Sequence, residues 1–230
     1  TKISWLRDDY SNAVKAIKER LMRTTDGPLK LTYVGEKVRY TSSVVPKMDH
    51  LVCFLPGTLA LGYHLYNTHN QKKLFTEDFK EHLAIAESLA RTCFQMYNST
   101  ATGLSPEIAY FESGENEVRI RPADSHNLLR PEYVESLFYL YHITGKQIYR
   151  DQGWQIFEAF NRYCKVKSGG YTSIGDVRNP KQTRPKDMQE SFWSAETLKY
   201  LYLLFSDDKV LIDKLLNYFV FNTEAHLIPV

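Results

Sequence analysis

Arg130-Pro-Glu-Tyr-Val-Glu-Ser-Leu-Phe-Tyr-Leu-Tyr141 begins with charged residues and ends in an apolar run. Pro131 has no backbone N–H to donate, so it fits the first turn of a helix, where that donor has no intrahelical partner. Glu132 and Glu135 stand three positions apart, so on a helix both carboxylates project from one face near the positive end of the helix dipole. Apolar residues then recur at helical spacing, at Val134, Leu137, Phe138 and Tyr141. The stretch therefore predicts a buried helix with paired carboxylates at its start.

The composition around this stretch fits a domain with a substantial core. Of the 230 residues, 43% are hydrophobic and 13% are aromatic. Lys and Arg total 29 against 27 acids, a net charge of +2, so the chain lacks the basic footprint of a protein that binds nucleic acid or an anionic membrane. No apolar run reaches the roughly 18 residues that span a bilayer. The chain starts at Thr1 and shows no signal peptide, so we expect upstream processing or truncation.

Outside the opening stretch the chain is predicted to be mostly helical. Apolar residues recur with the helical period in Ser4–Arg23, Leu51–Tyr66, Glu77–Tyr97, Tyr149–Tyr163 and Glu190–Phe205. Alternation of apolar and polar residues predicts a hairpin in Leu29–Tyr40 around Gly35-Glu36, and short strands in Glu117–Arg121 and Ser168–Ile174. Asn67–Lys73 is predicted to be a polar loop. Several connections are long, and long loops in compact domains are usually functional.

These connections and the helix starts concentrate acids, histidines and aromatic rings. They hold Asp49, His50, Glu107, Asp124, His126, Arg130, Glu190, Phe192, Trp193, Glu196 and Glu224. Carboxylates bind hydroxyl groups and do acid–base chemistry, and aromatic rings stack on sugar faces, so the mixture is typical of a carbohydrate pocket. Acids at helix N-termini are also ordinary capping, and histidines are often structural, so spacing alone leaves both interpretations open.

Five segments, in order along nearly the whole chain, resemble the class I α-1,2-mannosidases, glycoside hydrolase family 47. They are Met48-Asp-His-Leu-Val-Cys-Phe54, Gly103-Leu-Ser-Pro-Glu107, His126-Asn-Leu-Leu-Arg-Pro-Glu132, Ala195-Glu-Thr-Leu-Lys-Tyr200 and Phe221-Asn-Thr-Glu-Ala-His226. The last of these is the most specific. The sequence Leu51-Val-Cys-Phe-Leu-Pro-Gly57 is more similar to the endoplasmic reticulum members of the family than to the Golgi members.

The resemblance implies an all-α fold, an (αα)7 barrel of helical hairpins with short β-hairpins in the connecting loops. It implies calcium-dependent, inverting hydrolysis of terminal α-1,2-linked mannose from the high-mannose N-glycans of glycoproteins. The family's catalytic domain is much longer than this chain. Residues 1–230 are therefore expected to be the C-terminal portion of a single such domain, about half of the barrel, completed by the missing N-terminal half.

The resemblance also assigns roles to individual residues. Glu132 corresponds to the proposed general base, and Thr223 to the ligand that binds Ca²⁺ through its hydroxyl and carbonyl oxygens, as suits a hard cation. The residues expected to bind sugar hydroxyls or calcium-bound water are Arg130, His50, Glu107, Glu135, Phe192, Glu196 and Glu224. The family's glutamate proton donor and the aspartate of its Asp-Ser-Tyr-Tyr motif have no counterpart here. An inverting hydrolase needs two carboxyl groups about 6.5–9.5 Å apart, so only one side of that pair is matched.

Three cysteines alone allow one disulfide and one thiol, or three thiols. The resemblance implies a disulfide between Cys53 and Cys93 and therefore an oxidising secretory lumen, in the endoplasmic reticulum or Golgi. Any membrane anchor is then expected outside this chain. Cys164 is left as a buried free thiol, and Asn98-Ser-Thr100 is an N-glycosylation sequon.

Two alternatives stay open. Some family relatives act in endoplasmic reticulum quality control and disposal, where a mannosidase-like domain recognises misfolded glycoproteins. Those relatives often keep the residues that correspond to Glu132 and Thr223, so these two residues do not distinguish that role from hydrolysis. A different helical-hairpin barrel, such as an inverting glucanase or a terpene-type scaffold, is disfavoured by Phe221–His226.

Overall fold

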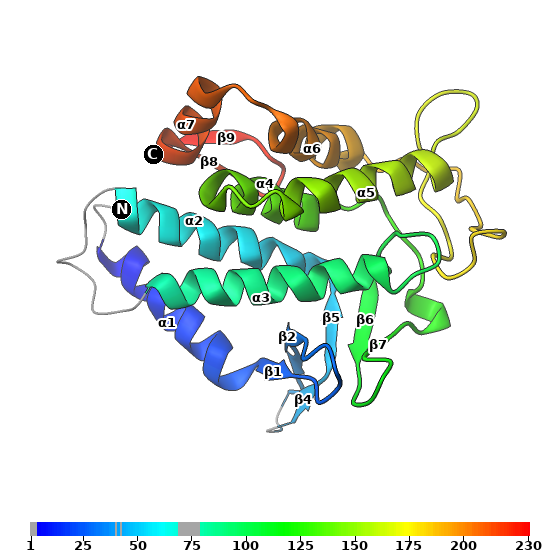
Figure 1. Cartoon of the computed structure of the whole chain (residues 1–230), viewed down its shortest axis with the longest axis horizontal. Coiled ribbons are helices and arrows are strands. Elements are labelled where there is room, and N and C mark those ends of the chain that lie inside the picture. The colour runs from blue at the N-terminus through cyan, green and yellow to red at the C-terminus, as the bar shows by residue number, and fades with distance from the viewer. Residues whose placement is uncertain (1–3, 40, 42, 69–78) are drawn as a thin grey trace.

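The computed structural model describes residues 4–39, 41, 43–68 and 79–230, and these form an array of helices with short β-hairpins beside it (Figure 1). The α-helices are α1 (Ser4–Arg20), α2 (Leu55–Thr68), α3 (Phe79–Asn98), α4 (Glu132–Thr144), α5 (Ile148–Tyr163), α6 (Leu198–Phe205) and α7 (Lys209–Tyr218). Short helical turns are η1 (His50–Phe54), η3 (Pro122–Asp124) and the π-turn η4 (Trp193–Thr197). Among the described residues, no helix combines the length and the apolar character needed to cross a membrane.

Helix α4 lies in the middle of the array and packs against α2, α3, α5 and α6. It buries seven residues on either side of the partly exposed Glu135: Tyr133, Val134, Ser136, Leu137, Phe138, Tyr139 and Leu140. Gly145, in the left-handed conformation with φ of 69°, ends the helix and donates its N–H to the Tyr141 carbonyl. The helix predicted from Arg130–Tyr141 is confirmed. Consecutive helical hairpins, α2–α3 and α4–α5, are the repeating unit of the fold.

The contact between α2 and α4 is close because Gly57 stands at the crossing. A Cβ atom added at Gly57 would lie 3.0 Å from the Ser136 Cα, so a larger residue has little room. The Ser136 hydroxyl accepts the Gly57 N–H at 2.9 Å and donates to the Cys53 carbonyl. These bonds fix the start of α4 against the segment that carries His50.

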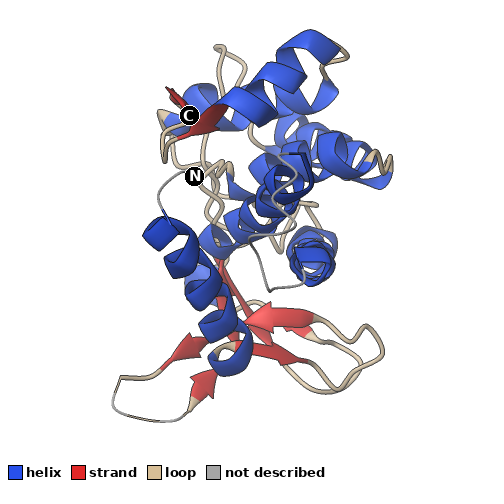
Figure 2. Ribbon diagram, turned by 90° about the vertical axis from the view of Figure 1, so that its left-hand side faces the viewer, coloured by secondary structure: helices blue, strands red, loops and turns tan. Residues whose placement is uncertain are grey.

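The described β-strands are short, and each pair of neighbours is antiparallel. They are β1 (Met22–Thr24), β2 (Thr32–Val34), β3 (Glu36–Lys37), β4 (Val44–Val45), β5 (Lys47–Asp49), β6 (Ile108–Phe111), β7 (Val118–Arg119), β8 (Phe219–Phe221) and β9 (Leu227–Pro229). Figure 2 shows β1–β7 gathered at one end of the helices, with the β8–β9 hairpin apart from them near the C-terminus. In the β5–β6 ladder Asp49 pairs with Ile108, and the His50 N–H bonds the Glu107 carbonyl at 2.8 Å. This sheet therefore places His50 beside Glu107.

Two sequence predictions are wrong in detail. Gly35-Glu36 is not the turn of a hairpin, because β2 pairs backward with β1 and β3 pairs forward with β4. The true turn before β2 is held by buried Glu117, which accepts the Thr25 hydroxyl and the Leu29 N–H. The helix predicted from Glu190 begins as the π-turn η4, and α7, capped by Asp208, follows it unpredicted.

Other predictions are confirmed or lie outside the described residues. The helices predicted in Ser4–Arg23, Leu51–Tyr66, Glu77–Tyr97 and Tyr149–Tyr163 are present with shifted ends, and most of the predicted loop Asn67–Lys73 falls in undescribed positions. The Cys53–Cys93 disulfide is present, with the two Cα atoms 5.9 Å apart, and joins η1 to α3. Cys164 is a buried free thiol whose pKa burial raises to about 12.

Candidate active site

Glu132, the first residue of α4, lies at the centre of the predicted site residues. Its side chain is 13% exposed; Oε2 lies 2.6 Å from His50 Nδ1, and Oε1 lies 3.7 Å from Arg130 Nη1. Burial alone would raise the pKa of this carboxyl, but the hydrogen bond with His50, the charge of His50 when protonated and the charge of Arg130 outweigh it, so the pKa is lowered. The group is therefore an ionised proton acceptor at neutral pH.

Arg130 joins Glu132 to Glu107. Its Nε donates to Glu107 Oε2 at 2.6 Å, and its guanidinium carbon lies 5.8 Å from the centre of the Phe192 ring. Burial would lower the pKa of Arg130, but the hydrogen bond and charge of Glu107 and the charge of Glu132 raise it. The guanidinium therefore neutralises part of a negative cluster and presents its plane beside an aromatic ring.

The segment before α4 aims Arg130 and Glu132 through a strained residue. Buried Leu129 has φ of 63°, which β-carbon crowding disfavours. Asn127 holds this turn: its Oδ1 accepts the Leu129 N–H at 2.9 Å, and its Nδ2 donates to the Ser105 carbonyl at 2.8 Å. Thr197 closes the other side by donating its hydroxyl to the Leu129 carbonyl at 2.6 Å. Asn127 and Thr197 were not predicted as part of the site, since the bonds from Asn127 to Ser105 and from Thr197 to Leu129 join residues 22 and 68 positions apart.

Two further predicted acids lie close enough to Glu132 to interact with it. Burial, opposed by the hydrogen bond from Tyr200 and reinforced by the charges of Glu132 and Glu196, raises the pKa of Glu135 to about 7. Burial and the charges of Glu132 and Glu224 raise the pKa of Glu196 to about 6. Glu132, Glu135 and Glu196 thus form one electrostatically coupled group of carboxyls.

Thr223 and Glu224 occupy the tip of the β8–β9 hairpin. Asn222 Oδ1 accepts the backbone N–H of Glu224 at 3.0 Å and of His226 at 2.9 Å, which shapes the tip. Lys199 Nζ donates to the carbonyl of buried Ala225 at 2.9 Å and ties the tip to α6. Phe221 packs on Tyr200 of α6, with ring centres 5.3 Å apart. The hairpin therefore approaches the cluster of acids, of which Glu196 is a member, from the side of α6.

The remaining predicted residues lie at the margin. His126 contributes its carbonyl, which accepts the Glu107 N–H at 3.0 Å, and Asp124 accepts the Tyr110 hydroxyl at 3.0 Å. Asn98 is exposed at the end of α3. Tyr97, one residue earlier, was missed: its hydroxyl lies 2.6 Å from His50 Nε2. It could not be told from an ordinary apolar position of a long helix.

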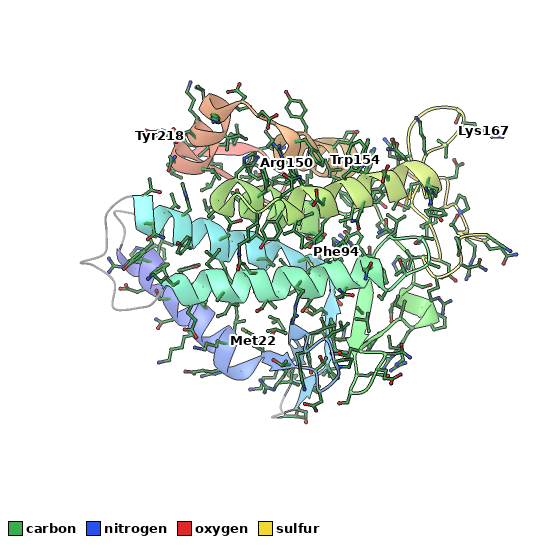
Figure 3. The ribbon with its side chains drawn as sticks, viewed as in Figure 1. Met22, Phe94, Arg150, Trp154, Lys167 and Tyr218 are labelled. Carbon is green, nitrogen blue, oxygen red and sulfur yellow. A yellow bond between two sulfur atoms is a disulfide. The ribbon has the colours of Figure 1, made fainter. Side chains whose placement is uncertain are left out.

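Two surface hollows lie away from these acids, and Figure 3 labels a residue of each. One, of about 440 Å³, is next to Trp154 on α5. The other, of about 450 Å³, surrounds Arg150 between the end of α4 and α7. None of the predicted site residues lines either hollow.

The helical hairpins bring together a coupled set of carboxyl groups, an arginine and an aromatic ring. This arrangement places the chain in the class of helical-barrel glycoside hydrolases. Within that class the chain belongs to glycosyl hydrolase family 47, whose family model matches residues 1–230. It is 51% identical to a mannosyl-oligosaccharide 1,2-alpha-mannosidase of Arabidopsis thaliana, with 100% of this chain and 39% of the plant protein covered. It is 49% identical to the endoplasmic reticulum mannosyl-oligosaccharide 1,2-alpha-mannosidase of Homo sapiens, with 98% of this chain and 30% of the human protein covered.

A solved structure agrees with this assignment. The alpha-1,2-mannosidase from Trichoderma reesei superposes with a TM-score of 0.81 at 27% identity, over 97% of this chain and 47% of that one. The all-α, (αα)7-barrel fold expected from the resemblance is therefore confirmed for the part of the barrel that this chain forms. The chain spans less than half the length of each of these three relatives.

Proposed function

We propose that this chain is the C-terminal part of a calcium-dependent α-1,2-mannosidase, which hydrolyses terminal α-1,2-linked mannose from high-mannose N-glycans with inversion. The observation that carries the proposal is the arrangement of Glu132 between His50 and Arg130, on a chain whose relatives are named mannosyl-oligosaccharide mannosidases. The substrate class comes from those names, and the contacts around Glu132 support the roles proposed for the individual residues.

Glu132 is proposed as the general base. An ionised carboxylate, held on one side by His50 and on the other by Arg130, keeps a fixed orientation in which it can accept a proton from an attacking water. His50 is 2% exposed and uses both ring nitrogens within the protein, so it acts on Glu132 instead of on a sugar hydroxyl. Arg130 and Phe192 are then left to contact the sugar, together with the side chains of Glu107, Glu135, Glu196 and Glu224.

Thr223 fits a calcium ligand on its surroundings. It is exposed at the hairpin tip, and among the described residues no hydrogen bond occupies its hydroxyl or its carbonyl oxygen. Within those residues no three His, Cys, Asp or Glu side chains are grouped as metal ligands, so an ion would rely on Thr223 directly and on carboxyls that hold its water ligands. Bound calcium would position and polarise the attacking water and sugar hydroxyls.

The proton donor is proposed to come from outside residues 1–230, in the N-terminal half of the same domain. Inversion requires a second carboxyl group across the scissile bond, about 6.5–9.5 Å from the base. The chain's coverage of 30–47% of its relatives is consistent with this division of the site.

Localisation in the secretory lumen, in the endoplasmic reticulum or Golgi, is proposed on two grounds. The Cys53–Cys93 disulfide needs an oxidising compartment, and the human relative carries an endoplasmic reticulum name. The exposed Asn98 of the sequon is open to glycosylation there.

The test is release of mannose from a high-mannose oligosaccharide by the full-length protein, with calcium and with a chelator. Calcium-dependent release of mannose whose first-formed anomer is inverted would support the proposal. No release from the free oligosaccharide, combined with binding to misfolded glycoproteins, would favour the quality-control role instead.

A further inference from the structure

A buried row of hydrogen bonds runs behind Glu132. His50, in η1, places Nδ1 2.6 Å from Glu132 Oε2 and Nε2 2.6 Å from the Tyr97 hydroxyl. Both aromatic side chains are 2% exposed, so water does not compete for these bonds. Three elements that are distant in sequence therefore meet through one imidazole ring: α4, η1 and α3.

The proton positions in this row follow from what each group can donate. Ionised Glu132 only accepts, so His50 Nδ1 must carry a hydrogen. Among the described residues, the Tyr97 hydroxyl has no hydrogen-bond partner besides His50, and a buried O–H that donates to nothing is costly. Every group is satisfied at once only when Tyr97 donates to Nε2 and His50 is the neutral Nδ1–H tautomer.

The disulfide holds this geometry in place. Cys93 precedes Tyr97 by one helical turn on α3, and Cys53 follows His50 by three residues in η1. The covalent link therefore lies one turn away from the His50–Tyr97 bond and fixes the same two elements. On its other side the Tyr97 ring packs against Tyr133, with ring centres 5.5 Å apart.

We infer that Tyr97 is a positioning residue for the reaction: its hydroxyl fixes the tautomer of His50 that donates to Glu132, and so keeps the base ionised and oriented. The inference rests on the proposed function of Glu132. Without the Tyr97 hydroxyl, Nε2 of His50 loses its hydrogen-bond donor, so Nδ1–H becomes a weaker donor and Glu132 loses part of the interaction that keeps its pKa low.

The pH dependence is set by the groups that surround Glu132. They are His50 from η1, Tyr97 from α3, Glu107 ahead of β6, Arg130 ahead of α4, Glu135 from α4 and Glu196 from η4. Because only Tyr97 is changed in the test, a shift in the acidic limb of the pH profile of kcat/KM reports a change in the His50–Glu132 hydrogen bond. A weaker donor raises the pKa of the base and moves that limb to higher pH.

The experiment compares Tyr97→Phe with Tyr133→Phe in the full-length, calcium-loaded protein. Tyr133 is an adjacent buried tyrosine whose hydroxyl donates to Gln152 Oε1 at 2.8 Å, so the control removes one buried hydroxyl without touching His50. We expect Tyr97→Phe to lower kcat about 10-fold at near-constant KM and to move the acidic limb upward by about half a pH unit or more. Tyr133→Phe leaves the limb in place. Equal effects of the two substitutions would overturn the inference.

A second measurement does not depend on turnover. In ¹⁵N-histidine-labelled protein, with the His50 signals assigned by their loss in His50→Gln, the nitrogen shifts report which ring nitrogen is protonated. We expect the Nδ1–H tautomer in the native protein, and in Tyr97→Phe a changed Nε2 shift that marks the loss of the hydrogen bond from the Tyr97 hydroxyl. A protonated Nε2 in the native protein would overturn the hydrogen-bond assignment. Absence of mannose release from the native protein, with the expected tautomer present, would overturn the function of Glu132 while retaining the His50–Tyr97 bond.

Discussion

Glu132 and Glu135 are separated by one helical turn, yet their surroundings push their pKa values in opposite directions. Glu132 has His50 and Arg130 as partners, which lower its pKa below the usual value despite burial. Among the described residues, the Glu135 carboxyl accepts the Tyr200 hydroxyl at 3.3 Å and faces the charges of Glu132 and Glu196. Two titratable groups whose surroundings move their pKa values apart are typical of a catalytic site. The group with the lowered pKa acts as the base, and its neighbour with the raised pKa is held in the neutral form.

Glu135→Gln should stabilise the calcium-free, full-length protein at high pH. Because the folded-state pKa of about 7 exceeds the usual 4.5, folding is favoured by proton binding, and that contribution is lost as pH rises between these values. The glutamine is neutral throughout and still accepts the Tyr200 hydroxyl. Chemical unfolding should show a gain of up to about 3 kcal/mol at pH 8 that vanishes near pH 4.5.

The matched control is Glu19→Gln on exposed α1, which should change stability equally at both pH values. A Glu135→Gln variant with no pH-dependent gain would mean that Glu135 is ionised at neutral pH in the folded protein.

Thr223→Ala should weaken calcium binding and lower activity together. The substitution removes the hydroxyl but keeps the backbone carbonyl, whereas Thr223→Ser keeps both proposed ligands. Isothermal titration of the full-length protein with Ca²⁺ should show loss of affinity for the alanine variant and near-native affinity for the serine variant. Unchanged affinity in Thr223→Ala would place the ion elsewhere.

At the level of elements, most helices were predictable, although α7 was missed, and the geometry between the helices was not predictable. The Arg130–Tyr141 stretch specifies α4 by local signals, a first-turn proline and a terminal glycine. The strained turn at Leu129 depends on Thr197, which the fold brings from 68 residues away, and on Asn127, which is anchored to Ser105, 22 residues away. No local pattern encodes such a contact.

The same limit explains the errors in the strands and the omission of Tyr97. The turn between β1 and β2 is held by Glu117, which stands 92 residues from Thr25, one of the residues it binds. The roles predicted for the site came from motif resemblance, which carries three-dimensional information that spacing lacks. His50, Glu107, Arg130, Glu135 and Glu196 do come together around Glu132, while the roles of the predicted site residues stay predictions.

Cys93→Ser should destabilise the full-length protein by about 2–4 kcal/mol, because the disulfide closes a loop between residues 40 apart. Thermal unfolding would show the loss, with Cys164→Ala as a control that removes a thiol and leaves the disulfide intact. Peptide mapping without reduction should recover Cys53 linked to Cys93. Recovery of both as alkylated thiols would contradict the oxidising compartment.

At the scale of the molecule, the chain is a partial barrel. Large apolar side chains stay exposed on several elements, including Trp5, Phe54, Trp154, Tyr202 and Tyr218. We expect the missing part of the barrel to cover some of these side chains. We therefore expect residues 1–230 alone to be insoluble or inactive, and the protein that also holds the N-terminal half to be soluble and active. Turnover by the 230-residue chain alone would mean that the proton donor is already present, with Asp49 and Glu107 as the first residues to test.

The most direct test of the account is turnover by Glu132→Gln in the full-length protein, with calcium affinity measured on the same preparation. Glutamine keeps the shape and the contact with His50 but cannot accept a proton from water. The matched control is Glu112→Gln, whose carboxylate only pairs with exposed Arg119. We predict that Glu132→Gln lowers kcat by about 10²-fold or more while calcium affinity stays near native, and that the control stays active. Near-native turnover by Glu132→Gln would show that another carboxylate is the base.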